Sequence, residues 1–179
     1  MRQADENRFR EFARHHALPL RRSAYLLCGD WHLAEDLVQA TLIKLHGVWP
    51  RVDRVHQPVS YARKILLNRW LAERRRAWRR SEDRSGDVPE GTGLEWSPET
   101  SQEQAELRAE LFGLLAAIAP RQRAVLVLRF IEELSVAETA AALDCSEGTV
   151  KSQTAKGLAA IRAALDTRSG APVLSKEQR

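Results

Sequence analysis

The sequence predicts an all-α protein of two small helical domains joined by a flexible acidic linker, with a helix-turn-helix in the second domain. Apolar residues recur at helical spacing through most of the 179 residues. Residues 81–101 contain three glycines, two prolines and six acidic residues against one basic residue, as a linker does. A short turn separates two helical patterns near the C-terminus. The boundaries that follow are 1–80, the linker 81–101, 102–167 and a tail, 168–179.

The composition excludes secreted and membrane-spanning proteins. No run of about 18 apolar residues exists, and the first twelve residues are too polar for a signal peptide, so we expect a cytoplasmic protein without membrane insertion. Cys28 and Cys145 lie far apart in the chain, which indicates reduced thiols. Residues 1–80 carry 17 Lys or Arg against 8 Asp or Glu, an excess that indicates a partner bearing phosphates.

The first domain should begin with two helices between Glu6 and Leu27, broken at or restarted by Pro19. A turn follows at Gly29 and Asp30, and the next helix should run from His32 to Val48 and end at Trp49-Pro50. That helix carries apolar residues on more than one face. Such a helix is either buried on all sides or binds a partner through the face that its own domain leaves free. The spacing of its apolar residues does not distinguish these two alternatives.

The helix expected from Ser60 to Arg80 is the most basic part of the chain. From residue 63 onward it contains eight Lys or Arg and one acid, Glu73, interleaved with Tyr61, Trp70 and Trp78. Basic residues neutralise phosphates and aromatic rings stack on unpaired bases, so the pattern indicates nucleic-acid binding. The alternative is a solvated basic helix whose tryptophans belong to the core.

The linker could reach about 70 Å when extended, which spans two turns of a DNA duplex at about 34 Å each. The second domain should then form a four-helix unit. Its first helix covers Gln102 to Ala119, and its second, Arg121 to Ile131, should pack beneath the helix-turn-helix.

The helix-turn-helix begins with Ser135 and Glu138, which form a capping-box pattern. Asp144 and Cys145 make the turn, and Ser146 caps the second helix. On this helix we expect a core-facing row of Val150, Thr154, Leu158, Ile161 and Leu165. The exposed residues should be Thr149, Lys151, Ser152, Gln153 and Lys156, a set suited to reading a major groove. The alternative is an ordinary helical hairpin with a polar outer face.

In this order of elements, the chain resembles bacterial RNA polymerase sigma factors of the sigma-70 family, extracytoplasmic function group, and looks most like its actinobacterial SigE-like branch. Four stretches carry the resemblance: AEDLVQATLIKL (34–45), SYARKILLNRWLAERRR (60–76), PRQRAVLVLRF (120–130) and VAETAAALDCSEGTVKSQTAKGLAAIR (136–162). The similarity runs from about Phe9 to Leu165. It implies a promoter-specificity subunit that binds core RNA polymerase and recognises double- and single-stranded promoter DNA.

The resemblance also implies roles for individual residues. Those matching the surface for the coiled coil of the polymerase largest subunit are Glu35, Asp36 and Gln39. Those matching the contacts to the downstream (−10) element and its separated strands are Arg63, Lys64, Asn68, Arg69 and Arg74. Thr149, Lys151, Ser152, Gln153 and Lys156 match the helix that reads the upstream (−35) element. An anti-sigma factor is left open as a further partner, and no cofactor is implied.

Two other functions compete with this interpretation. A stand-alone transcription regulator would use the helix-turn-helix alone, but it would have no reason to keep a second docking face on residues 34–45. An enzyme or zinc site would have to use Cys28 and His32 with His15 or His16. No glycine-rich loop, acid partner or second cysteine accompanies them, so we expect no catalytic residue and no metal site.

Overall fold

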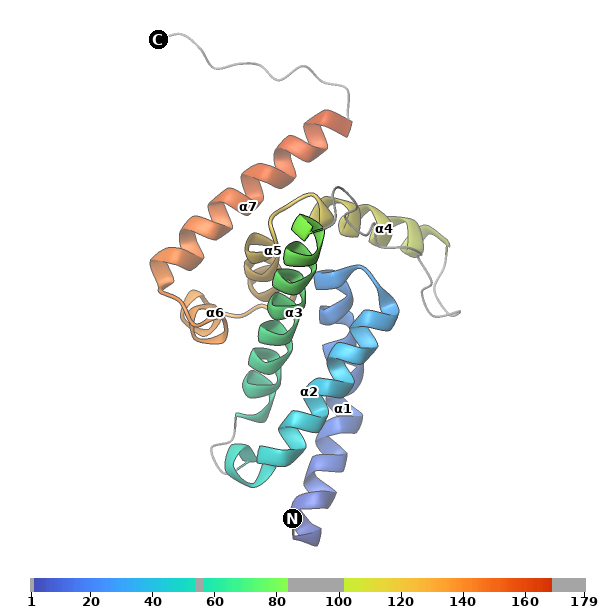
Figure 1. Cartoon of the computed structure of the whole chain (residues 1–179), viewed down its shortest axis with the longest axis vertical. Helices are drawn as coiled ribbons and strands as arrows, with labels where there is room; N and C mark the ends of the chain where they lie inside the picture. Colours follow the sequence, from blue (N-terminus) through green and yellow to red (C-terminus); the bar gives the residue numbers. More distant parts are fainter. Residues whose placement is uncertain (1, 54–56, 84–101, 169–179) are drawn as a thin grey trace.

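The computed structural model describes residues 2–53, 57–83 and 102–168, and it confirms the all-α class (Figure 1). The elements are α1 (Gln3–Cys28), α2 (Trp31–Val52), α3 (Pro58–Asp83), α4 (Gln102–Ala116), α5 (Pro120–Leu126), the π-helical turn η2 (Val127–Ile131), α6 (Val136–Leu143) and α7 (Glu147–Arg168). Residues 84–101 and 169–179, which hold most of the predicted linker and tail, lie outside the described residues.

The predicted turn at Gly29 and Asp30 connects α1 to α2. Gly29 has a φ of 73°, the left-handed conformation that glycine adopts without a steric cost, and its N–H donates to the Tyr25 carbonyl at 2.7 Å. The Asp30 carboxylate then accepts from the Leu33 N–H at 2.9 Å and caps α2. These two residues allow α1 and α2 to pack along each other (Figure 1).

The predicted breaks at Pro19 and Trp49-Pro50 are wrong. Both prolines lie inside continuous helices, α1 and α2. Each proline removes one backbone hydrogen bond from its helix. Leu20 and Trp49, next to these prolines, are buried, and the free energy of their packing compensates for the lost hydrogen bond, so both helices continue. Helix α3 begins at Pro58, where proline fits the first turn, and continues to Asp83, three residues into the stretch that we expected to be linker.

The helix-turn-helix has the predicted caps and turn. Ser135 Oγ accepts from the Glu138 N–H at 3.1 Å, and the Glu138 carboxylate accepts from the Ser135 N–H at 2.8 Å, which completes the capping box. Asp144 takes a left-handed conformation, with φ 53°, at the end of α6. Ser146 Oγ accepts from the Thr149 N–H at 3.1 Å and caps α7.

The buried face of α7 differs from the predicted row. Val150 is fully buried, but Leu158 and Leu165 are 42% and 39% exposed. The helix instead packs through Gly157, where a Cβ atom would lie 3.0 Å from Leu126 Cδ1. Because Gly157 has no side chain, α5 can approach α7 closely at this point. With Gly157 facing α5, the neighbouring Leu158 points toward solvent.

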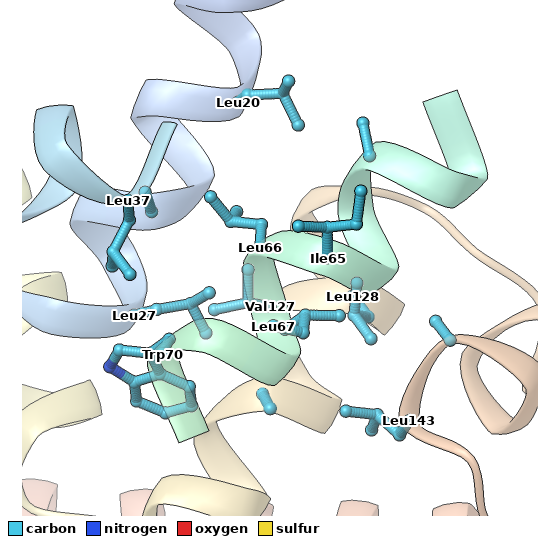
Figure 2. Close-up of a cluster of buried hydrophobic side chains, with 14 of the residues drawn as sticks. Leu20, Leu27, Leu37, Ile65, Leu66, Leu67, Trp70, Val127, Leu128 and Leu143 are labelled. Atoms are coloured by element: carbon cyan, nitrogen blue, oxygen red, sulfur yellow. The ribbon is translucent and has the colours of Figure 1, made fainter. Parts of the chain in front are cut away.

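The two predicted domains share one core in the described part of the chain. Figure 2 shows Leu66 and Trp70 of α3 in one cluster with Leu27 of α1 and Val127 of η2. Leu143 of α6 reaches the same cluster, on the other side of α3. Helix α3 therefore joins the N-terminal helices to the helix-turn-helix unit, and the two units are docked.

Candidate polymerase and nucleic-acid interfaces

Helix α2 has one buried face and one exposed face, so it is not wholly internal. Ala34, Leu37 and Val38 are buried in the core. The residues predicted to bind polymerase, Glu35, Asp36 and Gln39, are all exposed. The only one of these three with an ion pair among the described residues is Glu35, 3.8 Å from Arg21. Ile43, one turn beyond Gln39, is 74% exposed and adds an apolar group along the helix.

The predicted downstream-element residues lie along α3 but are not equally accessible. Asn68, Arg69 and Arg74 are exposed, and Lys64 is half-buried. Arg63 is half-buried because its guanidinium contacts the second unit: Nε and Nη2 donate to Glu132 Oε2 at 2.8 and 2.5 Å. The structure therefore exposes three of the five residues, leaves Lys64 partly accessible and holds Arg63 in an ion pair.

The aromatic residues of α3 divide between core and surface. Trp70 is fully buried in the shared core, so for this residue the alternative reading is correct and base stacking is excluded in this arrangement. Tyr61 is 38% exposed, so part of its side chain is accessible. The side chain of Trp78 lies outside the described residues.

A shallow pocket of about 330 Å³ gathers part of the predicted downstream set on one side of α3. Tyr61, Lys64, Asn68 and Arg69 line it, together with Lys44 of α2. Sequence reasoning missed Lys44, because nothing in its local pattern shows that it faces α3. The pocket offers one aromatic ring, one amide and three cations, a combination suited to an unpaired base and its phosphate.

A larger groove, of about 1040 Å³, lies between the C-terminal half of α3 and the second unit. Its basic lining residues are Arg74, Arg75, Arg76, Arg79 and Arg121. Asp144, in the turn of the helix-turn-helix, is the acidic member of the lining. The groove extends the positive surface of α3 toward the recognition unit, which suits a phosphate backbone.

Helix α7 presents most of its predicted reading surface. Lys151, Ser152 and Lys156 are exposed, whereas Thr149 and Gln153 are half-buried. Ser152 Oγ donates to the Thr149 carbonyl at 3.0 Å, and the Thr149 hydroxyl lies 2.9 Å from Ser146 Oγ. In the free chain the helix itself therefore satisfies these hydroxyl groups, while both lysines extend into solvent.

Arg123 is a buried residue that joins the two units, and sequence reasoning missed it. It is 4% exposed and lies on α5. Its guanidinium donates to the Leu27 carbonyl at 2.6 Å and to the Ala116 carbonyl at 3.1 Å. These carbonyls end α1 and α4, neither of which has a basic residue in its last turn. Arg123 thus caps one helix of each unit with its positive charge.

The alternative enzymatic site gains no support from the geometry. Burial raises the pKa of the Cys28 thiol to about 11, so the sulfur is protonated at neutral pH and is a poor nucleophile. Among the described residues, no three His, Cys, Asp or Glu side chains are grouped as metal ligands would be. In the same ranges, no helix has the length and apolar character needed to span a bilayer.

Family models match both halves of the chain. The model of sigma-70 region 2 matches residues 12–80, and the model of sigma-70 region 4 matches residues 108–161. These ranges contain most of α3 and of the helix-turn-helix, including all the predicted DNA-binding residues.

Curated relatives match nearly the whole length. The chain is 37% identical to the RNA polymerase sigma-E factor of Streptomyces avermitilis over 96% of this chain and 93% of that protein. It is 36% identical to the sigma-E factor of Streptomyces coelicolor over 96% and 94%. The ECF RNA polymerase sigma factor SigE of Mycolicibacterium smegmatis is 34% identical over 85% of this chain and 59% of its own length.

Solved structures share the fold. The sigma factor RpoE, solved with the anti-sigma factor NepR from Bartonella quintana, superposes with a TM-score of 0.73 at 23% identity, over 88% of this chain and 96% of that one. CnrH, solved with the cytosolic domain of CnrY, gives 0.66 at 21% identity, over 90% of each chain. The chain therefore belongs to the extracytoplasmic function group of the sigma-70 family, and it is a promoter-recognising sigma subunit of RNA polymerase.

Proposed function

We propose that this sigma subunit binds core RNA polymerase through α2, the downstream promoter element through α3 and the upstream element through α7. The observation that carries the proposal is the free face of α2, where Glu35, Asp36 and Gln39 are exposed opposite a fully buried row. A stand-alone regulator needs no such face. On the polymerase we assign the partner as the coiled coil of the largest subunit, and we place the complex in the cytoplasm, with promoter DNA.

On the downstream side, α3 supplies charge and one stacking surface. Lys64, Arg69 and Arg74 would neutralise phosphates and release their counterions. Asn68 can hydrogen-bond a base edge, and Tyr61 can stack on an unpaired base, which contributes roughly 1–3 kcal/mol. Capture of unpaired bases lowers the free energy of strand opening, so the subunit would assist melting by binding and not by a chemical step of its own.

On the upstream side, α7 would enter the major groove with Lys151 and Lys156 on phosphates and Gln153 on a base edge. The short side chains of Thr149 and Ser152 permit a close approach. We assign the first DNA-binding unit to residues 1–83, because α3 runs to Asp83, and the second to residues 102–168, because α7 runs to Arg168, with residues 84–101 as the tether. An anti-sigma factor is a further proposed partner, because the structural neighbour RpoE was solved with the anti-sigma factor NepR.

The test is reconstitution with core RNA polymerase that lacks sigma and a library of promoter fragments, followed by sequencing of the transcripts. Discrete starts that require this chain are expected, and they would identify both promoter elements. If the chain binds DNA but neither binds core polymerase nor initiates with it, the stand-alone regulator becomes the better account.

A pair of matched variants tests the polymerase face. Replacing Asp36 and Gln39 with alanine should abolish association with core polymerase while leaving helicity unchanged. The control replaces Glu11 and Asn7 with alanine, which removes the same two kinds of group from exposed positions on α1. Loss of helicity only in the Asp36 and Gln39 variant would show that these residues support the fold instead.

A further inference from the structure

Ile43 of α2 is the most exposed large apolar residue in the described part of the chain. It is 74% exposed, whereas Leu45, two positions later, is fully buried. Lys44 lines the pocket shared with α3, and Ile43 lies on the side of α2 that neither α1 nor α3 covers. Single exposed apolar residues are common on protein surfaces, so this exposure alone does not identify a binding site.

Gly47 lies one turn after Ile43 on the same side of α2. It is exposed, and a Cβ atom built there would meet nothing within 4 Å in the described residues. Glycine weakens the interior of a helix relative to alanine, and no neighbour in the chain needs the space that its missing side chain leaves. A competing reason is Pro50, because a glycine could relieve a bend at the proline. The two explanations predict opposite effects of alanine on stability.

The exposed residues of α2 follow the spacing of a coiled-coil seam. Asp36, Gln39, Ile43 and His46 are separated by three, four and three residues, which is the spacing of the a and d positions of a heptad. All four are exposed. A seam of this kind on an outer face suits a partner helix that lies along α2.

His46 is held by α1, which leaves Ile43 as the apolar centre of the seam. The imidazole Nε2 lies 3.2 Å from Glu6 Oε2, and the ring packs edge-on against Phe9 with its centroid 4.9 Å away. Ile43 therefore forms a knob, and Gly47 forms a notch beside it. A helix along this seam would receive Ile43 between its side chains and could place a side chain of its own over Gly47.

We propose that Ile43 and Gly47 extend the polymerase face of α2 by about two turns beyond Gln39, and that both pack against one helix of the polymerase coiled coil. The inference rests on the proposed function, because it takes the partner of Asp36 and Gln39 as its own. Continuity of the seam is the reason for this partner. The acidic turn supplies charge and orientation, whereas Ile43 supplies the apolar anchor.

The first experiment measures the Kd of the full-length chain for core RNA polymerase that lacks sigma. Ile43→Ala removes the knob, and Leu18→Ala, at an exposed apolar position of α1, is the matched control. We expect Ile43→Ala to weaken association roughly ten- to hundredfold, as loss of a buried anchor does, and Leu18→Ala to bind as wild type does. Equal Kd values for the two variants would overturn the proposal.

The notch is tested by Gly47→Ala and Gly47→Leu. Both should raise the midpoint of thermal unfolding and still weaken association, about three- to tenfold for alanine and more for leucine. A purely structural role of Gly47 would not separate the two readouts in this way. Ala4→Leu, which adds the same bulk at an exposed position of α1, is the control. A lower midpoint for Gly47→Ala would assign the glycine to the bend at Pro50, and unchanged association would leave the notch empty in the complex; either result overturns the proposal.

A photo-crosslinker identifies the occupant. p-Benzoylphenylalanine at position 43 should crosslink to the largest polymerase subunit, and the same group at position 18 should not. Crosslinking from position 43 to another subunit would overturn the proposal. Failure of the proposed function is recognised separately, because the wild-type chain would then not bind core polymerase at all.

Discussion

The ring of Phe112 on α4 occupies the space in which a side chain at Gly29 would lie. A Cβ atom built on Gly29 would be 1.7 Å from Phe112 Cζ, and the same ring lies 5.8 Å from that of Tyr25. The turn between α1 and α2 is thus a docking site for the second unit. Position 29 requires glycine for two reasons: its φ is 73°, and any side chain there would collide with the Phe112 ring.

This relationship predicts a non-additive pair of variants. Gly29→Ala should lower the free energy of unfolding by about 3 kcal/mol or more, because the Phe112 ring has to leave in addition to the backbone strain. In a Phe112→Ala background the same substitution should cost only about 1–2 kcal/mol, the strain alone. Urea unfolding of the four chains measures the coupling. Equal costs in both backgrounds would mean that Phe112 does not rest on the turn.

Two helical glycines should respond to alanine in opposite directions. At Gly157 a Cβ would lie 3.0 Å from Cδ1 of the buried Leu126, so overpacking should exceed the gain in helix propensity and destabilise the chain by about 1 kcal/mol. At Gly47 nothing lies within 4 Å, so alanine should stabilise by about 0.5–1 kcal/mol. Thermal unfolding of both variants checks the signs. If Gly157→Ala stabilised the chain, α5 would have to lie farther from α7 than this 3.0 Å contact indicates.

The capping box predicts a dependence on pH. Hydrogen bonds with the side chain and backbone of Ser135 lower the pKa of the Glu138 carboxyl below its ordinary 4.5. A carboxyl with a lowered native pKa stabilises the fold above its ordinary pKa, and this contribution is lost as the pH falls through the lowered value.

The midpoint of thermal unfolding should therefore be higher for wild type than for Glu138→Gln at pH 7, and the difference should shrink as the pH is lowered below 4.5 and the carboxyl becomes protonated. Glu133→Gln, which changes an exposed carboxylate outside the cap, is the control. A difference that stays constant between pH 7 and pH 3 would contradict the role of the Glu138 charge.

Two residues of α7 should affect upstream DNA in different ways. Lys156 is exposed, and Lys156→Ala should weaken binding to any duplex and reduce the salt slope by about one. Gln153→Ala should change base preference by roughly 1–3 kcal/mol at one position. Binding to a library of duplexes at several salt concentrations separates the two effects. If base preference does not change with Gln153→Ala, this side chain does not face the groove.

The sequence by itself determined the elements whose signals are local. The Ser135 and Glu138 capping box, the Gly29 and Asp30 turn and the Ser146 cap depend on residues within a few positions of each other, so their chemistry could be read directly. Glu35, Asp36 and Gln39, which the resemblance singled out, are polar residues, and all three are exposed. The family resemblance rested on the order of these elements.

Only the tertiary structure decided what depends on distant contacts. Local rules predict that a helix ends at a proline, but α1 and α2 continue past theirs because Leu20 and Trp49 beside them are buried in the core. The close approach of Leu126 to Gly157 turned α7 away from the predicted row. The docking of the two units through Arg123 and Glu132 joins residues up to 109 positions apart, and no periodicity encodes such a pair. Helix propensity and capping depend on residues within one turn of each other. Which side chains and charges are buried depends instead on how all the helices pack together.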